Sequence, residues 1–236
     1  MRLDWDERAR ENARHYVATG QTEWSDQEFF ASGEKAIADD ILTDMINICQ
    51  GKDPKSMQVL EIGCGAGRLT RALANLFGEV HAVDVSGEMI SRARQALADK
   101  PNAHVYQNNG YNLAVVPALM PKWAAKTPRW LARIAPASWK REFDFAYSNI
   151  VFQHIPSREV IESYVREVHR LLRPGALFKF QVQGYPADTS PDDTWNGISF
   201  SDQQACEMAE RNGFEPRYRH GAETQYFWLW YFKKPE

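Results

Sequence analysis

Residues 59–67 read VLEIGCGAG, a short apolar run that ends in three glycines at alternate positions. The run has the aliphatic content of a buried strand, and Leu69, Leu73 and Leu76 follow it at helical spacing. Glycine tolerates positive φ angles and lets a ligand approach the main chain, while a helix start presents free N–H groups. The stretch therefore predicts a strand, a ligand-binding turn and a helix.

An acidic residue ends the next apolar run along the chain. Residues 80–85 form this second predicted strand, and Asp84 lies about twenty residues beyond the glycines. A carboxylate at this place in a βαβ unit accepts hydrogen bonds from ribose hydroxyls. A dinucleotide-binding turn is spaced G-x-G-x-x-G, but Arg68 occupies the position of its last glycine. These features indicate a nucleoside ligand and disfavour a nicotinamide-linked dehydrogenase.

The rest of the chain continues to alternate strands and helices, which is typical of a parallel sheet in an α/β protein. We expect six or seven strands, at residues 57–62, 80–85, 105–107, 143–147, 177–183, near 217, and 225–232. Capping boxes predict helix starts at Ser25 with Glu28 and at Ser201 with Gln204. The segment 173–175 reads RPG and predicts the end of a helix that begins near residue 157.

Composition and charge narrow the class of protein. The 236 residues are 44% hydrophobic and 25% charged, which is typical of one globular domain over 1–236. A formal charge of -3 gives no overall basic field for nucleic acid. Cys49, Cys64 and Cys206 form no CxxC pair, so we expect reduced thiols without zinc or disulfides. No signal peptide or membrane-spanning run is recognisable, and we expect a cytoplasmic protein.

Residues 114–142 interrupt the alternation of strands and helices. This segment is longer than the usual connection between strands, so we expect an inserted helical element before the fourth strand. It carries six Lys or Arg residues against one Glu, together with three Trp residues. Three interpretations stay open: a surface helix whose basic stems cover the core, a lid that contacts substrate, or a surface for a membrane or partner.

Four motifs in chain order resemble those of the class I S-adenosylmethionine-dependent methyltransferases. They are the glycine-rich stretch 61–67, the strand end 84–86, the fourth strand 143–148 and the approach to the fifth strand at 171–177. The resemblance covers residues 57 to the C-terminus. It implies a Rossmann-like three-layer sandwich, with helices on both faces of a seven-stranded, mostly parallel sheet whose last strand is antiparallel. An N-terminal helical cap at 1–50 would precede this core at 57–236.

The resemblance also implies S-adenosylmethionine as cofactor, S-adenosylhomocysteine as product and no metal, because displacement at a sulfonium releases a neutral thioether. Members of the family often bind adenine through an Asp after the third strand, where this chain has QNNG at 107–110, and an Asn oxygen can accept the same bond. Met89 either packs on the adenine ring or belongs to the core. The cofactor contacts that we expect are Glu61, Gly63, Cys64, Gly65, Gly67, Asp84, Val85, Met89, Asn108, Asn109, Gly110 and Ser148.

The acceptor is expected beside the residues that follow the fourth strand, at the carboxyl edge of the sheet. His154 is the candidate general base, since imidazole titrates near neutral pH; alternatively it orders its loop through a backbone hydrogen bond. In related methyltransferases the N-terminal segment folds over the cofactor, so Trp5 or Tyr16 could cap the pocket, or the segment packs as a plain arm. A packing role is also the alternative for Trp195, in a loop near the last strands. The substrate contacts that we expect are Tyr16, Asn149, Gln153 and Trp195.

The sequence thus predicts a methyltransferase (EC 2.1.1.-) that transfers a methyl group to an O or N atom of a small-molecule acceptor by in-line displacement. An RNA or protein methyltransferase that grips its partner with the basic insert is the alternative, and a non-catalytic cofactor-binding protein is a third hypothesis. DNA is not expected as a partner, because residues 148–151 read SNIV instead of the Asn/Asp-Pro-Pro-Tyr/Phe motif common in DNA N-methyltransferases.

Overall fold

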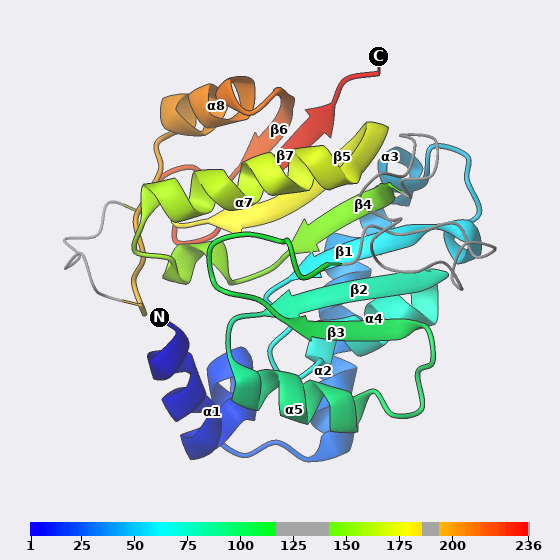
Figure 1. Cartoon of the computed structure of the whole chain (residues 1–236), viewed down its shortest axis with the longest axis vertical. Coiled ribbons are helices and arrows are strands. Elements are labelled where there is room, and N and C mark those ends of the chain that lie inside the picture. The colour runs from blue at the N-terminus through cyan, green and yellow to red at the C-terminus, as the bar shows by residue number, and fades with distance from the viewer. Residues whose placement is uncertain (117–141, 186–193, 236) are drawn as a thin grey trace.

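Seven strands form one sheet in the computed structural model, which describes residues 1–116, 142–185 and 194–235 (Figure 1). The strands are β1 (Gln58–Ile62), β2 (Glu79–Asp84), β3 (Ala103–Gln107), β4 (Phe143–Ser148), β5 (Leu172–Val182), β6 (Phe214–His220) and β7 (Phe227–Lys233). Their order is β3-β2-β1-β4-β5-β7-β6. Strand β7 is antiparallel to both of its neighbours and all other neighbouring pairs are parallel, which confirms the expected Rossmann-like sheet.

Helices cover both faces of this sheet. They are α1 (Arg2–Val17), α2 (Asp26–Asp40), α3 (Met45–Cys49), α4 (Arg68–Leu76), α5 (Gly87–Ala96), α7 (Arg158–Leu171) and α8 (Asp202–Arg211), with the short 3-10 helices η1 (Leu42–Asp44), η2 (Pro54–Ser56) and η5 (Phe152–His154). In Figure 1, α7 and α8 lie in front of the sheet, and α2 and α4 lie behind it. The expected three-layer arrangement is therefore present.

Alternation of side chains along the strands supplies a core to each face. Leu60 and Ile62 of β1 pack in one cluster with Phe180 and with residues of α7 and α8. Val59, the residue before Leu60, packs in the other cluster with Phe145 and with residues of α2, α3 and α4. Because β1 and β4 are buried on both faces, their carboxyl ends are held rigidly, and the glycine-rich turn begins at one of those ends.

Both expected capping boxes form, at Ser25 and at Ser201.

The fifth strand differs from the one expected. Strand β5 begins at Leu172, five residues earlier than expected, and includes the Arg-Pro-Gly segment predicted as a helix stop. Leu172 pairs with Phe143, and the register shifts before the next pair. The α7 helix still ends at Leu171, so the segment ends the helix by entering the sheet directly instead of forming a separate turn.

The proposed division into a cap at 1–50 and a core at 57–236 stays a prediction. Ile37 and Ile41 at the end of α2, with Ile48 of α3, pack directly into the cluster on one sheet face. Most of the inserted basic segment, residues 117–141, lies outside the described residues. Over the portions of the chain that the structure describes, no helix is long and apolar enough to cross a membrane.

Candidate active site

The turn after β1 has the conformation that its glycines predict. Gly63, Gly65 and Gly67 have φ angles of 78°, 51° and 87°, in the left-handed region that side chains disfavour. The N–H groups of Gly63 and Cys64 both donate to the Val83 carbonyl, at 2.7 and 3.0 Å, which fastens the turn to β2. A Cβ atom on Gly63 would lie 2.1 Å from a methyl group of Val151, and one on Gly65 would lie 2.6 Å from Val17. Only glycine fits at these two positions.

Asp84 binds the turn from the end of the neighbouring strand. Its Oδ2 accepts a hydrogen bond from Gly65 N at 2.9 Å, and its Oδ1 accepts one from Ser86 N at 2.8 Å. Burial raises the pKa of this carboxyl to about 6, although these backbone donors favour its charged form. The carboxylate is therefore mostly ionised at neutral pH and fixed in direction, which suits a group that accepts hydrogen bonds from hydroxyls.

A cavity lies over this turn, with an empty volume of about 850 Å³ that includes its open mouth. It joins the β1 turn, the ends of β2 and β3, the loop after β4, helix α7 and the N-terminal helix. Among the expected site residues it brings together Glu61, Gly63, Cys64, Gly65, Asp84, Val85, Met89, Asn108, Tyr16, Asn149 and His154. Six others stand outside its lining and stay predictions: Gly67, Asn109, Gly110, Ser148, Gln153 and Trp195.

Buried polar atoms without partners surround the cavity. Glu61 Oε2, Arg68 Nε and Asn149 Oδ1 are each hidden from solvent, and none has a hydrogen-bond partner. Burial raises the pKa of Glu61 to about 7, while the nearby Arg68 guanidinium favours the charged carboxylate. Since unpaired buried polar groups are costly, this arrangement fits a ligand that carries its own charged groups. The amino-acid end of S-adenosylmethionine, with one ammonium and one carboxylate, matches Glu61 and Arg68 in charge.

The end of β3 supplies the polar group expected for adenine. Asn108 is buried, and its Nδ2 donates to the Tyr164 hydroxyl of α7 at 2.7 Å. That bond points the amide oxygen the other way, where it accepts from Gly110 N at 3.3 Å. Burial raises the pKa of Tyr164, so its hydroxyl keeps its proton. Met89 is 1% exposed and belongs to a small core cluster, and it also lines the cavity, so its packing on the adenine ring stays a prediction.

Helix α1 forms the roof of the cavity. Asp6 Oδ1 accepts hydrogen bonds from Ser86 Oγ at 2.6 Å and Glu88 N at 3.2 Å, which joins α1 to the start of α5. Trp5 meets the His154 ring edge-on at a centroid distance of 5.3 Å, and both line the cavity. In the same way, Tyr16 meets Trp195 at 5.9 Å. The N-terminal segment therefore does more than pack as an arm, because it encloses the cavity.

A directed chain of hydrogen bonds crosses the loop after β4. Ile150 N donates to Gln181 Oε1 at 3.1 Å, Gln181 Nε2 donates to Gln153 Oε1, and Gln153 Nε2 lies 3.3 Å from His154 Nε2. His154 Nδ1 lies 2.6 Å from the Trp195 carbonyl. A backbone N–H can only donate and a carbonyl can only accept, so the chain has one direction. It places the His154 hydrogen on Nδ1 and leaves the basic lone pair on Nε2.

This chain also bears on the two interpretations of His154. The expected backbone hydrogen bond is present, and it reaches the loop at Trp195. The tautomer that this bond imposes is the one in which Nε2 can take up a proton.

Ile150, the first donor in this series of hydrogen bonds, has a φ of 55°, a conformation that β-branched residues rarely adopt. Strain of this kind costs about 1–3 kcal/mol and concentrates at functional sites.

Two expected residues hold the end of β4 in place. The Ser148 hydroxyl is buried and donates to the Ile62 carbonyl at 2.8 Å, which ties β4 to β1. Asn149 Nδ2 donates to Asp40 of α2 at 2.8 Å and to the Tyr147 hydroxyl at 3.0 Å. These bonds use the Nδ2 end of the Asn149 amide and leave its Oδ1 without a partner.

Sequence reasoning missed part of the cavity wall. In the sequence, Arg68 stands out only as a departure from the dinucleotide motif, and its position directly after the glycines is the signal that marks it as a site residue. Tyr164 and Met1 are far from the motifs in sequence, and only tertiary packing brings them here. Trp5 lines the cavity beside Tyr16, as the sequence allowed, and the lining residues that the sequence did not indicate are Met1, Val17, Ile62, Arg68, Leu69, Val83, Ile150, Val151, Ile155 and Tyr164.

Comparison with known proteins adds independent support. A family model described as a methyltransferase domain matches residues 60–178, about half of the chain. A curated relative, the malonyl-[acyl-carrier protein] O-methyltransferase of Enterobacter lignolyticus (strain SCF1), is 29% identical over 144 residues. That match covers 60% of this chain and 45% of the relative, so the chain spans less than half of the protein that it matches.

Solved structures share the fold at low sequence identity. Magnesium protoporphyrin IX methyltransferase from Synechocystis PCC 6803, with bound S-adenosylhomocysteine, has a TM-score of 0.64 at 14% identity, covering 99% of this chain and 98% of that one. The CcbJ methyltransferase from Streptomyces caelestis has a TM-score of 0.60 at 18% identity, covering 94% and 96%. At such identities the likeness shows a common fold.

Proposed function

Since this chain belongs to the class I S-adenosylmethionine-dependent methyltransferases, we propose that it transfers the cofactor's methyl group to an O or N atom of a small-molecule acceptor by in-line displacement. One observation carries the proposal. One continuous cavity joins the glycine turn and Asp84 to Asn149 and His154 after β4.

We assign the cofactor half of the cavity to residues of β1, β2 and β3. Asp84 would accept from the ribose hydroxyls, and Asn108 with Val85 would hold the adenine. Glu61 and Arg68 would pair with the ammonium and the carboxylate, which would satisfy their unpaired buried atoms. When bound, S-adenosylmethionine supplies a methyl group on a positively charged sulfur. The chain's own contribution is then largely positioning, which accounts for up to about 7–11 kcal/mol of a barrier.

The acceptor half lies under α1. Trp5 and Tyr16 give it an aromatic roof, and Asn149 Oδ1 offers a hydrogen-bond acceptor to an incoming hydroxyl or amine. His154 Nε2 would take the proton of a hydroxyl acceptor in place of its contact with Gln153. Enclosure by a helix and by aromatic rings supports an acceptor of metabolite size. The name of the curated relative, an O-methyltransferase, supports oxygen as the methylated atom.

The experiment is a transfer assay with labelled S-adenosylmethionine and a cell extract separated by size into metabolites, RNA and protein. We expect label in the metabolite fraction with release of S-adenosylhomocysteine. Label confined to RNA or protein would favour the alternative that uses the basic segment. Absence of transfer from a protein that binds the cofactor would favour the non-catalytic hypothesis.

The matched variant for this assay is Asp84→Asn, with Asp99→Asn at the surface pair with Arg71 as control. Hydrogen bonds to a charged group contribute about 1.5–3 kcal/mol, so Asp84→Asn should weaken cofactor binding about tenfold or more by calorimetry. Equal binding by the two variants would remove the ribose assignment.

The expected cytoplasmic location stays a prediction, supported by three cysteines that form no disulfide.

A further inference from the structure

Three side chains able to bind a metal lie together outside the cavity, on strands β2 and β3. Glu79 and His81 belong to β2, and His104 of β3 stands opposite His81 in the parallel register. Residues two apart on a strand share a face, as do paired residues of neighbouring strands, so all three side chains project from one face of the sheet. Of the residues that the structure describes, these form the one such group of His, Cys, Asp or Glu.

The distances suit coordination of a single ion. One ligand atom from each residue lies within 4.8 Å of the other two. His104 Nε2 is 2.8 Å from Glu79 Oε2, and the two imidazole rings have centroids 4.7 Å apart. Two ligand atoms that each lie about 2.1 Å from a tetrahedral ion are about 3.4 Å apart. This separation falls between the 2.8 Å contact of His104 with Glu79 and the 4.8 Å that bounds all three ligand atoms. Small side-chain rotations would therefore bring all three atoms onto one ion.

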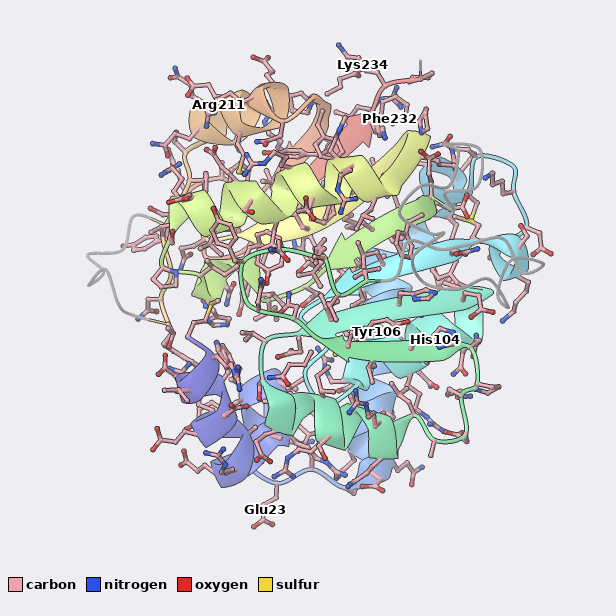
Figure 2. All side chains as sticks on the ribbon, viewed as in Figure 1. Glu23, His104, Tyr106, Arg211, Phe232 and Lys234 are labelled. Carbon is pink, nitrogen blue, oxygen red and sulfur yellow. The ribbon has the colours of Figure 1, made fainter. Side chains whose placement is uncertain are left out.

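The surroundings hold the cluster and leave a route to it. The Tyr106 hydroxyl lies 3.1 Å from His81 Nδ1 and fixes the direction of that ring. Figure 2 labels Tyr106 and His104 on β3. His81 is 6% exposed, whereas the side chains of His104 and Glu79 are 39% and 28% exposed. One side of the cluster is thus anchored in the protein, and the other can receive an ion and its water ligands.

We propose that Glu79, His81 and His104 bind a divalent transition metal of the zinc class. Two imidazoles and one carboxylate are the donors that such ions prefer, whereas magnesium and calcium prefer oxygen alone. The ion would cross-link β2 to β3, the strand at the edge of the sheet. Glu79 starts β2 and Asp84 ends it, about 16 Å away at 3.3 Å per residue, so this site is separate from the catalytic cavity.

The sequence predicted no metal, because methyl transfer from a sulfonium needs none and the cysteines form no CxxC pair. This site departs from that expectation. Glu79 and His104 are 25 residues apart in sequence, and the spacing of the three residues matches no zinc motif. Only the pairing of two parallel strands brings them together.

The test titrates the chelator-treated protein with two metals. Calorimetry monitors the binding of Zn²⁺, and the visible absorption of bound Co²⁺ monitors the binding of Co²⁺. We expect one ion per chain, a higher melting temperature and slower hydrogen exchange in β3. His104→Gln and Glu79→Gln should each lower Zn²⁺ affinity more than tenfold, because each removes a ligand. Tyr106→Phe should lower it about tenfold, because it removes the hydroxyl that orients the ligand His81. His220→Gln, at an exposed histidine on β6, is the control and should bind as the wild type does.

Cofactor binding separates this proposal from the proposed function. His104→Gln should bind S-adenosylmethionine normally, which also shows that the variant is folded. If the wild type binds no Zn²⁺, or if both His104→Gln and Glu79→Gln bind it as tightly as His220→Gln does, the proposal is overturned. Equal affinity for Mg²⁺ would overturn it as well, because hard cations do not select imidazole.

Discussion

At the scale of single residues, the cavity keeps charged groups where burial opposes them. Burial moves the pKa of Glu61 from 4.5 to about 7 and that of Asp84 from 3.8 to about 6. Each folded-state pKa lies above its unfolded value, so each group binds protons more tightly in the folded protein. Their contribution to stability is therefore present below about pH 4 and is lost as the pH rises toward 7. A cofactor ammonium beside Glu61 would favour the charged form of this carboxyl.

Glu61→Gln isolates this effect, because it removes the charge and keeps the shape of the side chain. We expect the stability gain over wild type to grow between about pH 4.5 and 7 and to reach about 3 kcal/mol, because burial raises the pKa of Glu61 from 4.5 to about 7. Urea unfolding at several pH values measures it. Glu34→Gln, at an exposed position on α2, should show no such trend. A gain that did not vary with pH would contradict the buried-charge argument.

The Trp195 carbonyl holds the hydrogen of His154 on Nδ1, and the amide of Gln153 donates toward His154 Nε2. In Gln153→Glu the introduced carboxylate would accept a hydrogen instead, so His154 would stay doubly protonated to higher pH. Nitrogen NMR of the imidazole should show the neutral Nδ1–H form in the wild type and imidazolium in the variant at neutral pH. Transfer to a hydroxyl acceptor should fall by about 10²–10⁴, with cofactor affinity unchanged. A neutral Nε2–H form in the wild type would refute the directed chain.

At the scale of elements, α1 is attached through a few polar contacts, whereas α2 and α4 are buried by apolar packing. Asp6 is the central contact, because its carboxylate accepts two hydrogen bonds at the start of α5, where the helix dipole favours negative charge. Ala9 and Ala13 of α1 add only a small apolar cluster with Phe29 and Met89. An element held in this way can open more easily than the sheet unfolds.

Asp6→Ala should therefore release α1 at a cost of about 1–2 kcal/mol, as loss of a helix-capping group does. Hydrogen exchange in residues 2–17 should speed up while the sheet stays protected, and KM for the acceptor should rise because the roof is lost. Glu7→Ala changes an exposed neighbour in the same helix and should behave like the wild type. Exchange that is equally fast in both variants would show that Asp6 does not hold the helix.

At the scale of the whole molecule, the cavity is assembled from segments far apart in the chain. Its lining runs from Met1, directly before α1, to Tyr164 in α7 and includes the ends of three neighbouring strands. A ligand that touches all of these segments stabilises the folded state as a unit, because unfolding of any one of them removes binding contacts.

S-adenosylmethionine should therefore raise the melting temperature of the protein as a whole. At a hundredfold excess over its Kd the stabilisation is about 2.7 kcal/mol, which corresponds to roughly 5–10 °C for a chain of this size. Differential scanning fluorimetry measures the shift, and Asp84→Asn should reduce it at the same ligand concentration. A saturating cofactor that leaves the melting temperature unchanged would contradict binding in this cavity.

The sequence by itself determined the glycine turn, the acidic strand end, the order of strands and helices and the family. These are local features, since positive φ angles require glycine and buried strands require apolar runs. The tertiary structure alone decided which distant groups meet: Tyr164 with Asn108, His154 with Trp195, and His81 with His104. Such contacts depend on how strands pair and where helices dock, and neither spacing nor composition encodes those choices locally.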